Sequence, residues 1–218
     1  MIIGIAGKAR AGKDTLGNFM SQYFSNKYDE HYELMAFAEH LKYMCKEHFE
    51  LSTWQVYGNE KEIPDKRYSK PTKPYCEESG KSELPYDCWT PREIMQELGS
   101  FYRKIDNDFW VRKLDGNIKG LSLSNVIITD VRHVNECEYV KNNGYLIKLK
   151  RYFTNEEEAK IHGMTHESET ALDDLSEGYF DLTVINHQGL AEFELTAHEV
   201  VEIILEFNKL RGGKVYNG

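Results

Sequence analysis

The sequence predicts an α/β fold in which helices cover both faces of a five-stranded, mostly parallel sheet, so that the fold has three layers. Two observations support this class. Five short apolar runs each end at a polar residue or a glycine and precede a helix-like stretch, which is the alternation that parallel βαβ units produce. The first run leads at once into a loop with two glycines. With 218 residues, 40% of them hydrophobic, the chain is long enough for one compact domain over residues 1–218 and is not of a disordered composition.

The expected elements follow from these runs in chain order. Strands are expected at residues 2–6, 32–37, 125–129, 145–150 and 181–185, and helices at residues 13–24, 39–49, 134–143 and 190–210. The last helix carries apolar residues at helical spacing, which indicates that one of its faces lies in the core: Phe193, Ala197, Val200, Val201, Ile204 and Leu205.

One connection is far longer than an ordinary crossover, and we interpret residues 38–124 as an insertion. Its first half, residues 52–89, is polar. Its second half opens with a helix start, because Thr90 can cap the helix, Pro91 suits the first turn and Glu93 completes a capping box. Gly99 is the expected end of that helix.

The charge and the cysteines limit the class of protein. The formal net charge is −9, which opposes non-specific attraction to nucleic acid or to an anionic membrane. No segment approaches the roughly 20 apolar residues of a membrane span, and no signal peptide opens the chain. The four cysteines form no C-x-x-C pair, which favours free thiols over zinc ligands at Cys76 and Cys88 and indicates a reducing, cytoplasmic setting.

A phosphate-binding loop follows the first strand. Two glycines five residues apart let backbone N–H groups point into one anion-sized hollow, the following helix adds its positive end, and Lys13 can reach the β- and γ-phosphates of a nucleotide. The usual Ser or Thr after the lysine, a ligand of Mg²⁺, is replaced here by Asp14, and a hydroxyl comes one residue later, at Thr15. The loop residues expected to hold the phosphates are Gly7, Lys8, Ala9, Arg10, Ala11, Gly12, Lys13, Asp14 and Thr15.

Polar residues also follow the expected strand 125–129. If that strand neighbours the first, Asp130 and Arg132 face the same crevice, because ligands bind at the carboxyl ends of parallel strands. Asp130 can then orient Mg²⁺ directly or through water, together with Asp14 or Thr15, and Arg132 can neutralise phosphoryl oxygens. The alternative is that Asp130 only caps the helix that begins near Val134.

Six segments together resemble the phage deoxynucleoside monophosphate kinases, and the likeness spans nearly the whole chain: GKARAGKDT, FAEHLK, PREIMQELGSFYRKIDNDFWVRKL, ITDVRHVNE, HESETALDD and FDLTVINHQGLAEF. The resemblance implies the P-loop NTPase fold and transfer of the γ-phosphoryl group of ATP, with Mg²⁺, to a deoxynucleoside 5′-monophosphate. It implies that residues 38–124 bind the acceptor and that residues 151–173 form a lid. It also implies an acceptor site formed by Arg92, Gln96, Trp110, Asp130, Arg132 and Glu136.

The residues themselves support parts of this reading. Arg92 and Gln96 are one helical turn apart and share a face, although Gln96 alone could be a solvated amide and Trp110 a core residue. In the lid, Arg151 is the candidate cation over the phosphates, whereas His166 and Glu169 favour capping or packing roles. Asn186 resembles the residue that touches the adenine of ATP, but a turn asparagine needs no ligand.

The expected mechanism is direct in-line transfer, with Lys13, Asp130, Arg132 and Arg151, and also Arg10, placed to act on the phosphates. The expected partners are ATP and a deoxynucleoside monophosphate, with no nucleic acid and no membrane, in the host cytoplasm if a phage encodes the chain. Whether the protein forms a homodimer stays open. Two alternatives also stay open: a P-loop kinase for another small molecule, of the dephospho-coenzyme A, gluconate or phosphomevalonate type, and a non-catalytic nucleotide-binding switch.

Overall fold

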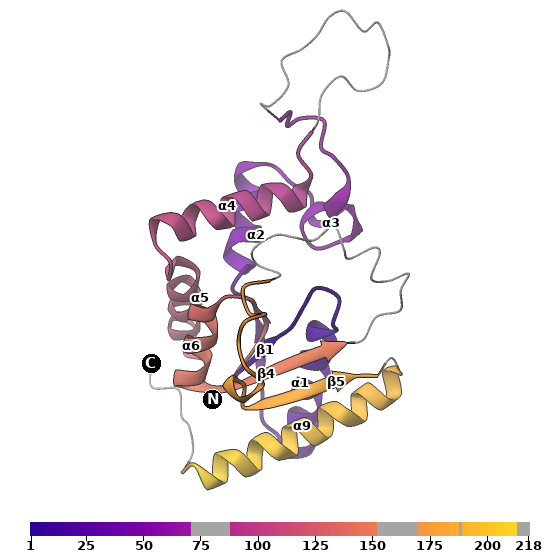
Figure 1. The fold of residues 1–218 in the computed structure, drawn as a ribbon, viewed down its shortest axis with the longest axis vertical. Coiled ribbons are helices and arrows are strands. Elements are labelled where there is room, and N and C mark those ends of the chain that lie inside the picture. Colours follow the sequence, from indigo (N-terminus) through magenta and orange to yellow (C-terminus); the bar gives the residue numbers. More distant parts are fainter. Residues whose placement is uncertain (71–87, 152–169, 188, 213–218) are drawn as a thin grey trace, which may run out of the picture. The chain divides into compact units, whose positions relative to one another are not determined.

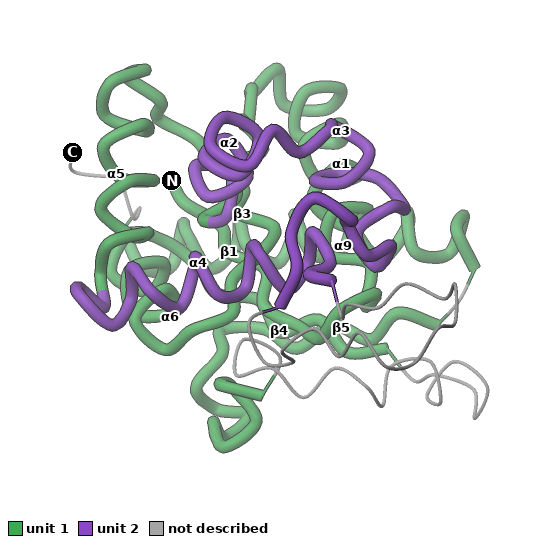
Figure 2. The backbone as a smooth tube through the Cα atoms, turned by 90° about the horizontal axis from the view of Figure 1, so that it is seen from above, with its two compact units in different colours: residues 1–37, 108–218 green, residues 38–107 purple. Residues whose placement is uncertain are grey.

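The computed structural model describes residues 1–70, 88–151, 170–187 and 189–212 (Figure 1). The chain divides into two compact units, and Figure 2 shows them in different colours. Unit 1 combines Met1–Phe37 with Asp108–Gly218, and unit 2 is Ala38–Asn107. The sequence interpretation treats the chain as one compact domain with an insertion over residues 38–124. In the structure, unit 2 begins at the expected residue, Ala38, but ends earlier, at Asn107. We describe each unit by itself.

Unit 1 is built on a five-stranded sheet, which confirms the predicted fold class. The strands are β1 (Ile2–Ala6), β2 (Glu33–Met35), β3 (Val126–Val131), β4 (Gly144–Arg151) and β5 (Leu182–Asn186), in the order β2-β3-β1-β4-β5. All four neighbouring pairs are parallel. The central strand β1 pairs with β3 on one side and with β4 on the other, so the carboxyl ends of these three strands lie at one edge of the sheet.

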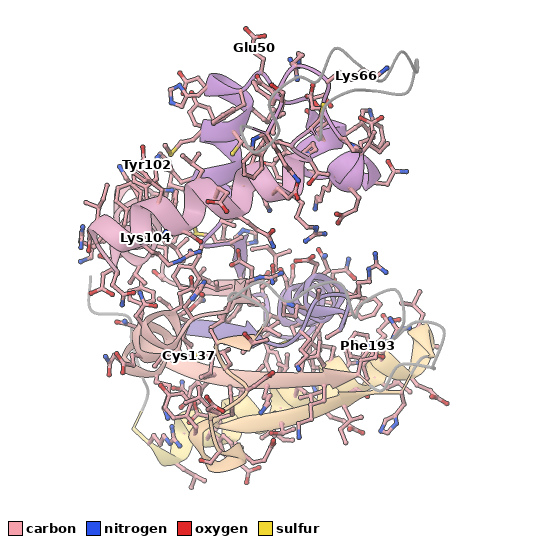
Figure 3. All side chains as sticks on the ribbon, turned by 45° about the horizontal axis from the view of Figure 1, so that its top comes forward. Glu50, Lys66, Tyr102, Lys104, Cys137 and Phe193 are labelled. Carbon is pink, nitrogen blue, oxygen red and sulfur yellow. The ribbon has the colours of Figure 1, made fainter. Side chains whose placement is uncertain are left out.

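Helices cover both faces of this sheet (Figure 1). The first core contains Ile3 and Ile5 of β1 with side chains from α1 (Lys13–Tyr28) and α9 (Leu190–Leu210), among them Phe193. The second contains Ile2 and Ala6 with side chains from α5 (Phe109–Gly120) and α6 (Val134–Asn143), among them Cys137. Figure 3 labels Phe193 and Cys137 in these two layers. Alternate residues of β1 thus enter opposite cores, as the pleat of a strand requires.

The bounds of β3, β4, β5 and α2 differ from the expected ones by one or two residues, and the larger differences concern β2, α1 and α5. Strand β2 has three residues instead of six, because only Glu33–Met35 pair with β3; Tyr32 is instead buried and stacked on Phe24, with ring centroids 3.9 Å apart. Helix α1 continues past Phe24 to Tyr28. Helix α5, which we did not assign from the sequence, packs in unit 1 through Trp110, Val111, Leu114 and Ile118.

Unit 2 contains α2 (Glu39–His48), α3 (Thr53–Val56), the 3₁₀ helix η1 (Asn59–Glu62) and α4 (Pro91–Ile105). The predicted capping box is confirmed, since the Thr90 hydroxyl accepts a hydrogen bond from the Glu93 N–H at 3.2 Å and the Glu93 carboxylate accepts one from the Thr90 N–H at 2.8 Å. The expected end at Gly99 is wrong. A Cβ there would lie 3.2 Å from Leu41 Cδ2, so Gly99 lets α2 pack closely against the middle of α4.

The described cysteines Cys45, Cys88 and Cys137 are buried and form no disulfide. Burial raises the pKa of the Cys45 thiol to about 11 and that of Cys137 to about 12, which keeps both protonated at neutral pH. Among the described residues, no helix has the length and apolar composition needed to cross a membrane.

Candidate functional site

The loop between β1 and α1 closes around the side chain of Lys13. This lysine is only 7% exposed, and its ammonium group donates to the carbonyl oxygens of Gly7 at 2.6 Å and Lys8 at 2.9 Å. Arg10 and Gly12 adopt left-handed backbone conformations, with φ of 62° and 99°. The loop therefore curls back on itself and holds one positive charge at its centre, next to the positive end of α1, which suits an anion.

The start of the loop lies flat against β4. A Cβ added at Gly7 would lie 2.5 Å from the backbone oxygen of Leu149, so no larger residue fits without moving β4. From β1 the chain crosses to β2 on one side of the sheet, and from β4 it continues to β5 on the other. The loop thus sits where neighbouring strands diverge, the position at which α/β sheets bind ligands.

The ends of two strands bind the crest of the loop, which is formed by Arg10 and Ala11. The Asn186 side-chain amide, at the end of β5, donates to the Ala11 carbonyl at 2.9 Å, and the Arg151 guanidinium, at the end of β4, donates to the Arg10 carbonyl at 3.3 Å. Both residues were predicted from the sequence as ligand-binding groups. In the structure they are joined to the loop itself, in contact with its backbone.

Hydroxyl and carboxylate oxygens lie close together where β3 packs against α1. Gly4 pairs with Ile128 and Ala6 with Val131, so two residues of β3, Thr129 and Asp130, lie opposite one residue of β1 in a β-bulge. The Thr129 hydroxyl donates to Asp14 Oδ1 at 2.6 Å, while Asp130 Oδ1 accepts from the Phe37 N–H at 2.7 Å. Within the described part of the chain, no group of three or more His, Cys, Asp or Glu side chains could hold a metal ion by itself. Mg²⁺ in nucleotide sites is usually bound by one or two carboxylates together with substrate phosphates and water, and the exposed Asp14 carboxylate fits that role.

The residues after β3 cap α6. Glu136 is 4% exposed, and its carboxylate accepts hydrogen bonds from the backbone N–H groups of Arg132 at 2.7 Å and His133 at 3.0 Å. His133 is the N-cap residue. The alternative in which Asp130 caps this helix is therefore wrong, because His133 holds the N-cap position, Glu136 closes the capping box from the third helical position, and Asp130 Oδ1 accepts from the Phe37 N–H.

The residues expected to bind the acceptor are divided between the two units. In unit 2, Arg92 forms an ion pair with Glu62 and Gln96 is half-buried one turn further along α4. In unit 1, Trp110 is 3% exposed and packs edge to face on Phe109, with ring centroids 4.8 Å apart. Most of the expected lid, with His166 and Glu169, lies outside the described residues, as does Cys76.

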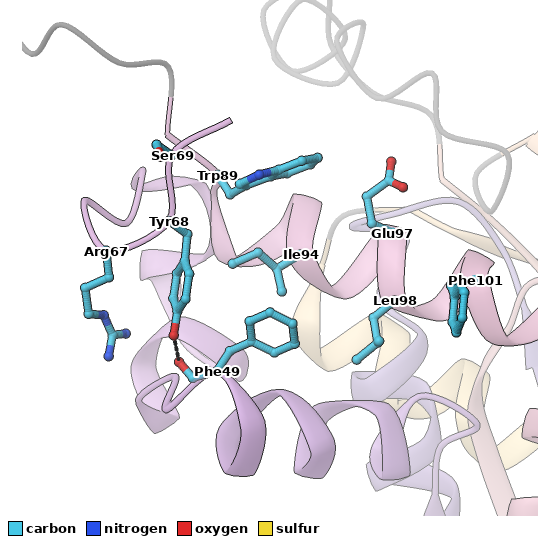
Figure 4. Close-up of a pocket in the computed structure, with 9 residues that line it drawn as sticks. All are labelled: Phe49, Arg67, Tyr68, Ser69, Trp89, Ile94, Glu97, Leu98 and Phe101. Carbon is cyan, nitrogen blue, oxygen red and sulfur yellow. Dashed lines mark hydrogen bonds between the residues drawn. The ribbon is translucent and has the colours of Figure 1, made fainter. Parts of the chain in front are cut away.

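Unit 2 also contains a cavity of about 590 Å³ that we did not predict (Figure 4). Tyr68 stands at one wall and donates a hydrogen bond to the Phe49 carbonyl at 2.6 Å, and Trp89 lies at another. Four residues of α4 at helical spacing also line the cavity: Ile94, Glu97, Leu98 and Phe101. This spacing places the cavity on a different face of α4 from Arg92 and Gln96.

Sequence reasoning missed Thr129, although it lies beside Asp130. A hydroxyl at the carboxyl end of a strand next to the phosphate-binding loop was the available signal, but its contact with Asp14 spans 115 positions in the chain. Only the adjacency of β3 and β1 makes that contact.

The chain is similar to known proteins both in sequence and in structure. The chain is 28% identical over 209 residues to a protein of Acanthamoeba polyphaga mimivirus named "putative deoxynucleotide monophosphate kinase", covering 88% of this chain and 92% of that protein. Among solved structures, it is similar to shikimate kinase from Aquifex aeolicus (TM-score 0.43, 16% identity, 96% and 99% of the two chains) and to dephospho-CoA kinase from Campylobacter jejuni (TM-score 0.46, 14% identity, 93% and 96%). These two scores are too low to support a function. No model of a known protein family matches the chain.

Proposed function

We propose that this chain is an ATP-dependent kinase whose acceptor is a deoxynucleoside 5′-monophosphate. One observation carries the first half of the proposal: Lys13, 7% exposed, is held by two loop carbonyls at the centre of a glycine loop that opens at the carboxyl ends of β1 and β4. The mimivirus relative supports the second half, since its name specifies a deoxynucleotide monophosphate as acceptor.

In this proposal the loop binds the phosphates of ATP and Lys13 turns its ammonium group toward the β- and γ-phosphates. Arg132, Arg151 and Arg10 are the cations that neutralise the transferring group. Asp14, Thr15 and Asp130 are the residues that hold Mg²⁺, which when bound draws negative charge from the phosphates. The acceptor attacks with a phosphate oxygen that is already anionic, so the chain needs no strong general base.

The acceptor is assigned to Arg92, Gln96, Trp110 and Glu136 together with Asp130 and Arg132. Arginine suits a phosphate dianion because its guanidinium makes two parallel hydrogen bonds. In the structure the Arg92 guanidinium forms an ion pair with the Glu62 carboxylate, so an acceptor phosphate would have to displace that carboxylate from Arg92. A glutamine amide such as that of Gln96 can pair with a base edge, since it both donates and accepts.

Selection against ribonucleotides would come from an enclosed sugar site. Burying a 2′-hydroxyl without a partner costs about 1–3 kcal/mol, which is roughly ten- to a hundredfold in kcat/KM. The aromatic candidates that could close such a site are Phe101, Tyr102 and Trp110. Phe101 lines the cavity of Figure 4, so it fits a sugar site at that cavity and not one beside Arg92 and Gln96. We expect dGMP to be preferred over GMP under saturating Mg-ATP, and equal or better use of GMP would remove the deoxy-specific part of the proposal.

The experiment that tests the reaction class is a coupled assay of ADP release with each candidate acceptor in turn. The set contains dGMP, dTMP, dephospho-coenzyme A, gluconate and phosphomevalonate, and Lys13→Ala serves as the inactive control. Turnover with a deoxynucleoside monophosphate alone supports the proposal. Turnover only with another acceptor would reassign the substrate, and nucleotide binding without turnover would favour a switch.

Two adjacent residues of α4 then locate the base. Gln96 lies on the face of Arg92, whereas Glu97 lines the cavity of Figure 4. Gln96→Ala should raise the acceptor KM while Glu97→Ala leaves it near the wild-type value. The reverse result would move base recognition to the cavity.

A further inference from the structure

The position after the loop lysine carries a carboxylate, and the hydroxyl that usually stands there is supplied from a different strand. Asp14 follows Lys13 in the first turn of α1, and Thr129 of β3 donates its hydroxyl hydrogen to Asp14 Oδ1 at 2.6 Å. This distance lies within the range of about 2.5–2.7 Å for a hydroxyl bound to a carboxylate, which is a strong class of hydrogen bond.

The contact is built into the packing of α1 on the sheet. A Cβ at Gly17, one turn after Asp14, would lie 2.6 Å from the Thr129 methyl carbon, so only glycine lets α1 approach β3 this closely. The methyl group of Thr129 therefore rests on Gly17 while its hydroxyl points to Asp14. Thr129 itself is 8% exposed, whereas Asp14 is exposed.

The β-bulge at this point of the sheet places Thr129 and Asp130 side by side opposite a single residue of β1. Asp130 uses one oxygen to accept from the Phe37 N–H, so its carboxylate is directed toward the end of the β2 segment. Asp14 is the carboxylate that stands in the first turn after the loop, and the hydroxyl of Thr129 fixes one of its two oxygens. A carboxylate offers about four lone-pair sites, so this bond leaves acceptor capacity for a cation.

We propose that Thr129 is a positioning residue that holds the Asp14 carboxylate for the metal ion of the metal–nucleotide complex. This rests on the proposed function in so far as that function requires a divalent cation with ATP. Thr129 acts through Asp14 and does not itself contact the nucleotide. A partner that orients a metal-binding carboxylate typically contributes ten- to a hundredfold to metal affinity.

The test measures metal affinity and does not depend on turnover. Mn²⁺ is titrated into the full-length protein saturated with ADP, and the dissociation constant of Mn²⁺ is compared for wild type, Thr129→Val and Thr129→Ser. Valine keeps the methyl group against Gly17 and removes the hydroxyl, whereas serine keeps the hydroxyl and removes that methyl group. Thermal unfolding of each variant, without metal or nucleotide, reports the packing contribution separately.

We expect Thr129→Val to weaken Mn²⁺ binding about ten- to a hundredfold, with the affinity for metal-free ADP unchanged, and Thr129→Ser to bind Mn²⁺ close to the wild-type value. Wild-type Mn²⁺ affinity in Thr129→Val would overturn the proposal, even if that variant unfolds at a lower temperature, because the contact would then only tie α1 to β3. Equal weakening in both variants would overturn it too. If no acceptor is phosphorylated by the wild type and Thr129→Val still weakens Mn²⁺ binding, the kinase assignment fails while the role of Thr129 stands.

Discussion

Removing the loop lysine tests the site most directly, and its effects on catalysis and on stability can be separated. Lys13→Ala deletes a side chain that makes two hydrogen bonds to loop carbonyls from a position 7% exposed to solvent. For catalysis, loss of one preorganised group acting on a developing charge costs about 100- to 1,000-fold in kcat, or about 2.7–4 kcal/mol. We therefore expect kcat to fall by at least this factor.

The stability cost should be much smaller than that of a core mutation. The residues whose carbonyls lose the ammonium group, Gly7 and Lys8, are half-buried and exposed, so water can replace part of the two bonds. The net loss is then about 1–3 kcal/mol in the free energy of unfolding. For a chain of this length each kcal/mol lowers Tm by about 2–4 °C, so the variant should stay folded at 25 °C.

The matched control is Lys8→Ala in the same loop, because this residue is expected to serve the phosphates through its backbone N–H group, which alanine keeps. The Lys8 side chain is 60% exposed and pairs with Asp173 at 3.0 Å, an exposed ion pair of about 0–1 kcal/mol at most. Circular dichroism, thermal unfolding and the coupled ADP assay are measured on both variants. The reasoning is refuted if folded Lys13→Ala keeps kcat/KM within tenfold of wild type, or if Lys8→Ala loses as much.

Three further predictions concern other parts of the chain. Arg92→Ala should raise the KM for the monophosphate far more than the KM for ATP; steady-state kinetics with each substrate varied in turn decides it, and equal effects would place Arg92 outside the acceptor site. Gly7→Ala should abolish tight ATP binding in a calorimetric titration, because its Cβ would lie 2.5 Å from the Leu149 carbonyl oxygen; wild-type affinity would show that the loop can shift away from β4. Hydrogen bonds from Lys27 and two tyrosines lower the pKa of Glu202 from 4.5 to about 2, so this carboxylate stabilises the fold above pH about 4.5, and that contribution disappears as the pH falls toward 2. Urea unfolding at pH 7 and pH 3 should therefore show that Glu202→Gln loses less unfolding free energy in acid than wild type does. The difference should be less than about 1 kcal/mol because the site is exposed, and equal losses in the two proteins would contradict the predicted role of Glu202.

Elements with a strong local signal could be predicted to the residue. Strand β1 and helices α6 and α9 have the expected bounds, since each carries an apolar pattern along its whole length. Helix α5 was missed because Gly116, in its interior, weakens its helical pattern. The length of β2 was decided by pairing with β3, which no local pattern reports.

The site follows the same division. The phosphate-binding loop is contiguous, so the spacing of Gly7, Gly12 and Lys13 was sufficient to predict it. The contacts that support the loop join distant positions: Asn186 reaches Ala11 across 175 positions and Thr129 reaches Asp14 across 115. Their side chains were visible in the sequence, but their partners depend on which strands become neighbours in the sheet.

The contacts from the ends of β4 and β5 order the backbone of the loop during folding, before a nucleotide binds. In a planar trans peptide the C=O and N–H groups point in opposite directions. The hydrogen bond from Asn186 to the Ala11 carbonyl therefore directs the Gly12 N–H away from β5. The backbone donors of the crest are thus oriented by the sheet and not by the ligand, and the conformational entropy of ordering them is lost on folding instead of on binding. A substitution of Asn186 at the end of β5 should therefore change nucleotide affinity mainly through the entropy of binding, although the Asn186 side chain does not need to touch the phosphates.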